Sequence, residues 1–146
     1  MNDIHLLRSA SALGDEDLID AYGRPPAPTL RVNFVSSADG AVSLDGHSAG
    51  LSGGPDKRVF GFLRMLCDGL LVGAGTLRDE GYGPVRLSDD RRTWRLAHDL
   101  PPYPTLVVVS GRLDLDPAAP VFAAAPVRPI VLVPGTGSRA APAGLD

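Results

Sequence analysis

The sequence predicts an α/β fold built on a mostly parallel sheet. Short apolar runs at 70–73, 106–109 and 130–133 have the length and composition of buried strands. A longer segment at 55–66 has apolar residues at helical spacing, and an alternating segment at 29–37 precedes it. Strands and helices that alternate in this order are typical of doubly wound sheets.

The first predicted element is a short helix near the N-terminus. Its first turn contains three acidic residues, whose charge interacts favourably with the helix dipole. Gly23 and Pro25 end the helical pattern. We interpret this helix as a lid or clasp. The acidic residues are Asp15, Glu16 and Asp17.

A strand is predicted at 29–37, because every second residue in its first part is large and apolar. Asp-Gly pairs at 39–40 and 45–46 follow it, and such pairs are turn signals. The chain is therefore expected to reverse tightly after this strand. The alternating apolar residues are Leu30, Val32 and Phe34.

The segment 55–66 is predicted to be a helix. Pro55 suits the first helical position, and Asp56 and Arg64 lie in the first and last turns, where their charges match the helix dipole. The apolar residues fall on one stripe, as expected for a helix that covers a core. This stripe contains Val59, Phe62 or Leu63, and Leu66.

The strand at 70–73 runs into a glycine turn, which is followed by Thr76 and Glu80. Backbone N–H groups and a hydroxyl at the carboxyl end of a buried strand lie where α/β sheets bind nucleotides. A glycine turn by itself is also common where close packing requires glycine. The turn therefore indicates a nucleotide site only together with other motifs.

A second long helix is predicted to begin at Ser88 and to end before Pro101. It would carry Trp94 and Leu96 as its apolar residues. Its basic residues are expected to form a solvated face. These are Arg91, Arg92 and Arg95. A short apolar piece at 121–122 separates the last two predicted strands.

Charge and cysteine content disfavour several functional classes. The 14 basic and 17 acidic residues give a net charge of -3, which is too balanced for a nucleic-acid-binding surface. Cys67 is the only cysteine and the three histidines are scattered, so neither a disulfide framework nor a metal site is expected. No apolar run approaches the ~18 residues of a membrane span, and the N-terminus does not have a signal-peptide pattern. We therefore expect a cytoplasmic protein without a membrane partner.

Several separated motifs occur in the order found in the pyrimidine reductases of riboflavin biosynthesis. They are Ser-Ser-Ala-Asp-Gly at 36–40, Gly-His-Ser-Ala-Gly-Leu-Ser-Gly at 46–53, Leu63-Arg64, Val-Gly-Ala-Gly-Thr at 72–76, Glu80 and Val85-Arg86. The chain resembles this family over roughly residues 29–133. It looks closest to the stand-alone branch, because a fused deaminase half would need zinc-binding residues that one cysteine cannot supply.

The resemblance implies a three-layer domain with a dihydrofolate-reductase-like fold and a mostly parallel sheet. We accordingly expect an N-terminal helical extension at 1–28, the N-terminal portion of a reductase domain at 29–134 and a loose tail at 135–146. The resemblance also implies a homodimer.

Members of this family use NADPH to convert the ribosyl side chain of a phosphoribosylamino-pyrimidine into a ribityl side chain. Planar guanidinium groups suit the sugar phosphate, and glycine lets the backbone approach a dinucleotide. By resemblance, Asp39 would orient the substrate or relay a proton to its imine nitrogen. The residues matched to the nucleotide are Val35, Gly73, Thr76 and Glu80; those matched to the substrate are Ser48, Arg64 and Arg86.

Each of these residues also has an ordinary structural interpretation. The pair Asp39-Gly40 by itself is more typical of a turn, and Thr76 can cap one. Arg64 can interact with the helix dipole alone, and Arg86 can be a surface charge. The site therefore depends on the motifs being taken together.

The chain also departs from the family pattern. Gly50 stands where many relatives have Trp, and Glu80-Gly81-Tyr82 replaces Asp-Asp-Pro. Relatives continue into a second glycine-rich turn before a helix, and nothing after Val133 matches it, so we expect the N-terminal portion of a longer reductase. The alternatives are a reductase of a pterin such as dihydrofolate, and a non-catalytic domain that binds a nucleotide or a partner.

Overall fold

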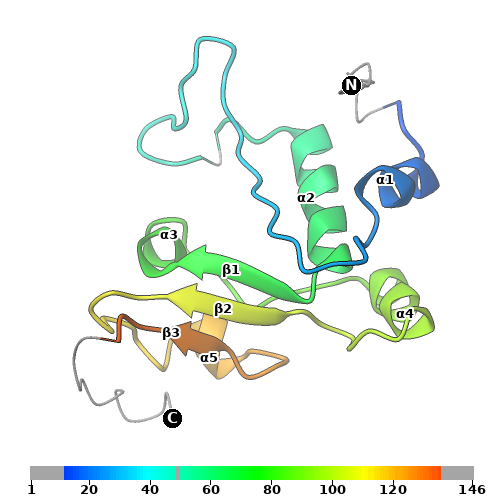
Figure 1. The fold of residues 1–146 in the computed structure, drawn as a ribbon. Coiled ribbons are helices and arrows are strands. Elements are labelled where there is room, and N and C mark those ends of the chain that lie inside the picture. Colours follow the sequence, from blue (N-terminus) through cyan, green and yellow to red (C-terminus); the bar gives the residue numbers. More distant parts are fainter. Residues whose placement is uncertain (1–11, 49, 136–146) are drawn as a thin grey trace. The chain divides into compact units, whose positions relative to one another are not determined.

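The computed structural model of the chain describes residues 12–48 and 50–135 (Figure 1). The chain divides into two compact units, Met1–Leu66 and Cys67–Asp146. The expected boundaries at 28/29 and 134/135 stay predictions, and the tail from 136 onward lies outside the described residues. No helix among the described residues is long and apolar enough to cross a membrane.

The first unit contains α1 (Asp15–Tyr22), which confirms the predicted N-terminal helix. At its start, the Asp17 carboxylate accepts a hydrogen bond from the Gly14 N–H at 2.8 Å. At its end, Gly23 adopts a φ of 39° and donates its N–H to the Ile19 carbonyl at 2.6 Å. Glycine is suited to this position because a φ in that range strains other residues.

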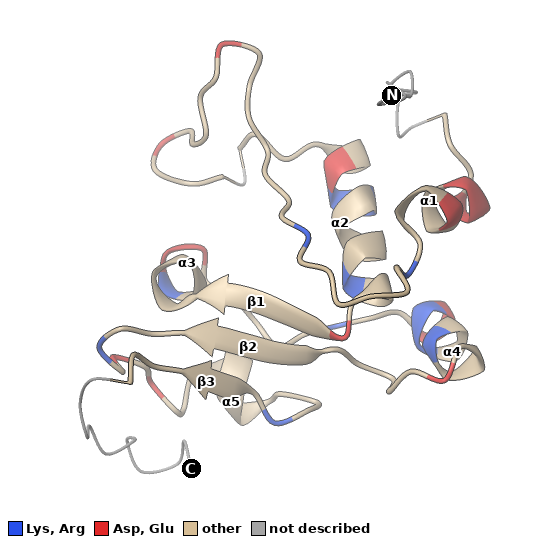
Figure 2. Cartoon of the chain, viewed as in Figure 1, with Lys and Arg blue, Asp and Glu red and all other residues tan. Residues whose placement is uncertain are grey.

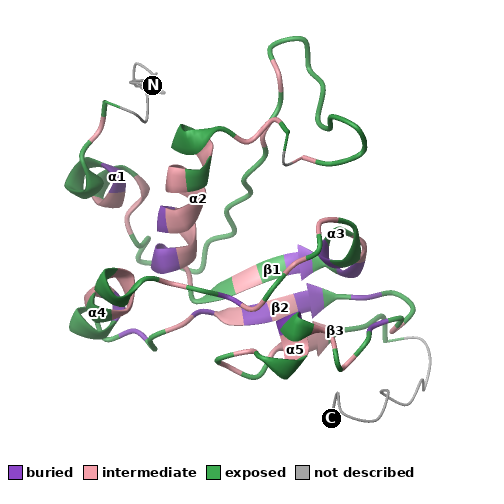
Figure 3. Ribbon diagram, turned by 180° about the vertical axis from the view of Figure 1, so that it is seen from behind, coloured by how far each residue is buried: buried purple, intermediate pink, exposed green. Residues whose placement is uncertain are grey.

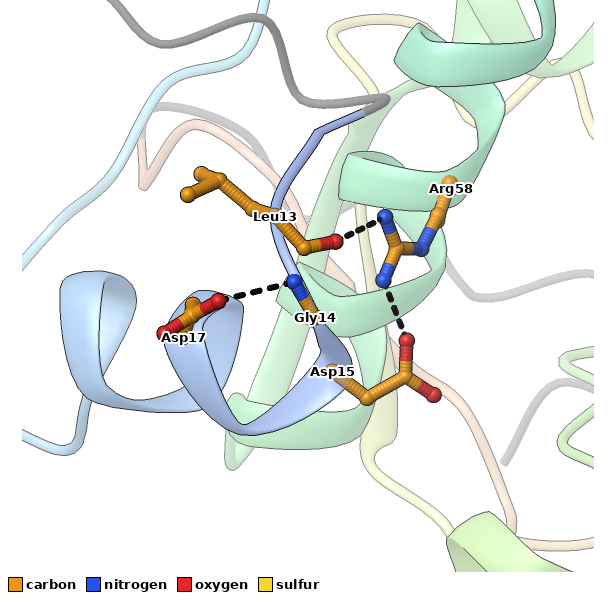
Figure 4. Close-up of polar contacts among 5 residues, drawn as sticks. All are labelled: Leu13, Gly14, Asp15, Asp17 and Arg58. Atoms are coloured by element: carbon orange, nitrogen blue, oxygen red, sulfur yellow. Dashed lines mark hydrogen bonds and ion pairs between the residues drawn. The ribbon is translucent and has the colours of Figure 1, made fainter.

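Helix α1 packs against α2 (Gly54–Leu66), the second helix of this unit. Arg58 of α2 donates to the Leu13 carbonyl at 2.7 Å and forms an ion pair with Asp15 (Figure 4). Arg24 donates to the Leu66 carbonyl at 3.0 Å. Two arginines therefore tie the N-terminal segment to α2, and its interpretation as a lid or clasp stays a prediction.

The prediction of a strand at 29–37 is wrong, because these residues form no strand with any described residue. The side chains that were expected to face a core are largely exposed: Leu30 by 75%, Val32 by 66% and Phe34 by 86%. An alternating pattern shows only that a segment can present one apolar face. A strand also needs a neighbouring strand to supply hydrogen-bond partners.

The predicted reversals after this segment are confirmed. The Ser37 N–H donates to the Ala41 carbonyl at 2.9 Å, which closes the first reversal. In the second, Asp45 and Gly46 have φ values of 52° and 82°, and Leu44 pairs with His47. This is the geometry of a type I′ turn, for which Asp-Gly is a preferred sequence.

The second unit is built on a parallel sheet in the order β1-β2-β3, and all three predicted strands are confirmed with small shifts at their ends. Residue pairs run in register from Gly69 and Thr105 to Gly73 and Val109. The third strand pairs with β2 from Val107 and Ile130 onward. The strands are β1 (Gly69–Gly73), β2 (Thr105–Val109) and β3 (Ile130–Leu132).

One face of this sheet carries the core of the unit, and Figure 3 shows buried residues along β1 and β2. The opposite face is half exposed, with Leu71 at 51% and Ile130 at 50%. Within its own unit the sheet is therefore covered on one face. The core residues are Val72, Ala74, Leu77, Val85, Leu106, Val108, Leu115 and Val121.

Three helices connect the strands. The sequence predicts α4 (Asp89–Ala97), whereas α3 (Ala74–Asp79) and α5 (Pro120–Ala123) occupy segments expected to be a turn and a short apolar piece. Burial explains why these two unpredicted helices form, because α3 places Ala74 and Leu77 in the core and α5 contributes Val121. Tertiary packing stabilises helices too short to form by themselves.

The expected solvated face of α4 is wrong at one position, since Arg95 is 0% exposed while Leu96 is 60% exposed. The Arg95 guanidinium donates from Nε to the Pro101 carbonyl at 2.6 Å and from Nη1 to the Cys67 carbonyl at 2.8 Å. Cys67 lies two residues before β1, and Pro101 lies four residues before β2. A buried cation is costly unless it is hydrogen-bonded, and here Nε and Nη1 each have a backbone carbonyl as partner.

We predict that Arg95→Met lowers the free energy of unfolding of the second unit by about 2 kcal/mol, because two hydrogen bonds from a charged group are lost. Urea titration followed by the fluorescence of the neighbouring Trp94 measures this change. Thr93→Ala, on the exposed part of the same helix, is the control and is expected to change stability by less than about 0.5 kcal/mol. Equal effects of the two substitutions would contradict the assigned role of Arg95.

Candidate functional site

A cleft of about 320 Å³ lies at the carboxyl ends of β1 and β2. Because the two strands are parallel and in register, their ends open at the same edge of the sheet. This edge is where open α/β sheets bind ligands. The lining residues are Gly73, Ala74, Gly75 and Arg78 on the β1 side, and Val109, Ser110, Gly111, Arg112 and Asp114 on the β2 side.

The polar groups of the cleft are mainly basic. Figure 2 shows basic residues on α3 and in the loop that follows β2. These are Arg78 and Arg112, both exposed, with Asp114 as the acidic residue of the lining. Arg78 donates to the backbone carbonyl of Asp114 at 2.9 Å. Guanidinium groups at this edge favour a ligand that carries phosphate or carboxylate.

At two positions in the cleft, neither packing nor backbone conformation among the described residues requires glycine. A Cβ added to Gly75 or Gly111 would meet no atom within 4 Å, so packing does not demand glycine there. Neither residue has a positive φ, so the backbone does not demand it either. Glycine at both positions leaves the backbone open to close approach by a ligand.

The residues matched to the nucleotide lie partly at this cleft. Gly73 lines it, whereas Thr76 and Glu80 lie on α3 and immediately after it and are not among the lining residues. The Thr76 Oγ1 atom is 3.8 Å from the position that a Cβ on Gly73 would occupy. The Glu80 N–H donates to the Thr76 carbonyl at 3.0 Å. Nucleotide contacts by Thr76 and Glu80 stay a prediction.

The residues matched to the substrate divide between the two units. Arg86 in the second unit is exposed and follows the buried Val85. In the first unit, the Arg64 guanidinium lies 4.1 Å from the centroid of the Phe60 ring. The Ser48 carbonyl accepts a hydrogen bond from the Leu51 N–H at 2.9 Å. Their roles in substrate binding stay predictions.

Asp39 lies in the first reversal of the first unit, and the Ser37 hydroxyl donates a hydrogen bond to its carboxylate. That bond, together with one from the Ala41 N–H, lowers the pKa of Asp39 below its ordinary value of 3.8. The carboxylate is therefore ionised at neutral pH. Its chemistry is that of an acceptor that orients a donor group, and it is a poor proton donor.

The remaining nucleotide-matched residue, Val35, is half-buried and also lies in the first unit. The motifs also predict that nucleotide and sugar phosphate meet in a crevice between the tips of two neighbouring strands that end at Asp39 and Thr76. No described strand leads to Asp39. Because the two residues belong to different units, the crevice itself stays a prediction. Among the described residues, no group of three or more His, Cys, Asp or Glu could hold a metal ion.

Sequence reasoning did not identify the β2 side of the cleft. Ser110, Gly111 and Arg112 follow an apolar strand just as the glycine turn follows β1. The signal that could have found them is this repetition of small and polar residues after each of two parallel strands. Arg78 gave no such signal, because its position depends on α3, which was not predicted.

We predict that Ser37→Ala raises the pKa of Asp39 toward 3.8, because the largest cause of the lowered pKa is removed. Because the folded-state pKa lies below the ordinary value, the stabilisation is present above that value and is lost as the pH falls through the folded-state pKa. Titration of the Asp39 carboxyl carbon by NMR measures the change. Ser43→Ala, beyond the reversal, is the control; an unshifted Asp39 pKa in the wild-type protein would refute this assignment.

Comparisons with known proteins identify the family of the chain. No curated protein matches it. A solved structure of a pyrimidine reductase-like protein from Corynebacterium diphtheriae is similar, with 27% sequence identity and a TM-score of 0.62. The match covers 72% of this chain and 44% of that one, so this chain spans less than half the length of the similar protein. Residues 28–140 match the RibD C-terminal domain family, and the chain belongs to that family.

Proposed function

We propose that this chain is part of an NADPH-dependent reductase that converts the ribosyl side chain of a phosphoribosylamino-pyrimidine into a ribityl side chain in riboflavin biosynthesis. Membership of the RibD C-terminal domain family supports a reductase of the riboflavin pathway. The similarity to a pyrimidine reductase-like protein supports the same class. The small-molecule substrate and the homodimer expected from the resemblance belong to this proposal.

The observation that carries the proposal is the basic cleft at the carboxyl ends of β1 and β2. Its volume of about 320 Å³ is suited to one phosphate-bearing part of a dinucleotide. In this proposal Arg112, which lines the β2 side of the cleft, contacts a phosphate group, and Arg78 adds positive charge on the other side. The open backbone at Gly75 and Gly111 provides N–H donors at close range. The donor set fits an anionic nucleotide.

When bound, NADPH supplies the hydride that reduces the imine carbon of the ring-opened sugar. The contribution of the chain is then mainly to bind and orient. In this proposal Arg64 and Arg86 hold the substrate phosphate, and Ser48 donates a hydrogen bond to the substrate. Asp39, ionised at neutral pH, accepts a hydrogen bond and fixes the orientation of the substrate.

The decisive experiment measures NADPH consumption by the purified chain. We expect absorbance of NADPH to fall on addition of the phosphoribosylamino-pyrimidine and to stay constant on addition of dihydrofolate. The reverse result would favour a pterin reductase. Binding of NADPH without turnover of either substrate would favour a non-catalytic nucleotide-binding domain, and absence of NADPH binding would refute the proposed cofactor. Sedimentation of the same sample tests the homodimer.

We predict that Arg112→Met raises the Kd for NADPH about tenfold, which corresponds to about 1.4 kcal/mol and to one charge-assisted hydrogen bond. Fluorescence titration of NADPH measures the Kd. Arg128→Met is the matched control, because Arg128 is an exposed arginine of the same unit that does not line the cleft. An equal loss of affinity in both variants would indicate a general charge effect and would contradict binding at the cleft.

A further inference from the structure

The segment 110–115, here called the exit loop, forms the β2 side of the cleft. Its two ends are anchored. Ser110 is 3% exposed and its N–H donates to the Leu132 carbonyl of β3 at 2.9 Å. Leu115 is buried in the core of the unit. The middle of the exit loop, Gly111 to Asp114, lies between these anchors.

The middle of the exit loop has a conformation that its sequence does not favour. Leu113 has a φ of 54°, a region that few residues other than glycine and asparagine adopt readily. Two local hydrogen bonds accompany this geometry. The Leu113 N–H donates to the Ser110 Oγ at 3.1 Å, and the Leu115 N–H donates to the Leu113 carbonyl at 3.0 Å. Additional contacts are needed to keep such a loop in one conformation.

Arg78 supplies a contact of this kind from the opposite side of the cleft. It lies on α3, and its Nη1 donates to the Asp114 carbonyl at 2.9 Å. The bond joins residues 36 positions apart in the chain. It attaches to the residue directly after Leu113, so it acts on the part of the exit loop that is least favoured by its own sequence.

We infer that Arg78 is a positioning residue that braces the exit loop so that Arg112 and the Gly111 backbone stay directed toward a bound anion. Arg112 makes the contact with the anion, and Arg78 acts through the loop. The inference rests on the proposed function for the identity of the anion, a phosphate of the nucleotide. The brace itself is a property of the protein without ligand.

The first test measures the brace without any ligand. In Arg78→Met, amide hydrogen exchange at Leu113 and Leu115 is expected to rise about tenfold, while exchange at Leu106 to Val108 in β2 stays unchanged. Arg78→Lys retains a donor and is expected to keep exchange close to that of the wild-type protein. Unchanged exchange in Arg78→Met would overturn the inference.

The second test separates bracing from direct contact by using NADP⁺ as the probe at several salt concentrations. Arg78→Met is expected to raise the Kd about fivefold and to weaken its dependence on salt less than Arg112→Met does, because the Arg78 charge lines the cleft without contacting the anion. Arg112→Met is expected to weaken that dependence, because a charge that contacts the ligand is removed. A salt dependence weakened equally in both variants would show direct contact by Arg78 and would overturn the inference.

A third variant tests whether the unfavourable backbone conformation of Leu113 is the reason why the exit loop depends on Arg78. Asparagine tolerates the left-handed conformation, so Leu113→Asn combined with Arg78→Met is expected to recover at least half of the lost affinity and protection. No recovery of either would contradict a brace that acts on Leu113. If NADP⁺ does not bind the wild-type chain, the proposed function fails, while the exchange experiment still decides whether Arg78 braces the loop.

Discussion

Parallel pairing of β1 with β2 is the constraint on which the candidate site depends. The register sets Gly73 opposite Val109, so both strands end at the same level of the sheet. The segments that follow, with Gly75 and Arg78 on one side and Arg112 on the other, are therefore brought together from distant parts of the sequence. An antiparallel pair would have placed these two ends at opposite edges.

The two edges of this sheet have different physical characters. At the edge where the strands begin, the buried Arg95 holds the carbonyls of Cys67 and Pro101, so the backbone there is fixed by satisfied hydrogen bonds. At the edge where the strands end, glycines leave open space and the arginines are exposed. Rigidity at one edge supports an open, charged surface at the other. This separation lets the fold be stabilised by residues that do not contact a ligand.

Backbone conformations that the local sequence disfavours occur mainly at the edge of the sheet where the strands end. Leu113 adopts a conformation that its side chain disfavours, and the exit loop is completed by a hydrogen bond from another element. In the two reversals of the first unit, by contrast, Asp39 and Asp45 occupy turns that their sequence favours. Departures from local preference are expected at binding sites, where the geometry serves a ligand as well as the fold.

The sequence by itself determined the elements whose signal is local: α2 from its amphipathic stripe and end charges, the three apolar strands, and the Asp-Gly reversals. The family motifs predicted, in addition, the fold and the roles of Asp39, Thr76 and Arg64. Only the tertiary structure decided that 29–37 forms no strand with any described residue, that Arg95 is buried, and that Arg78 and Arg112 share a cleft. The reason is that pairing, burial and convergence depend on partners distant in sequence, which no local pattern specifies.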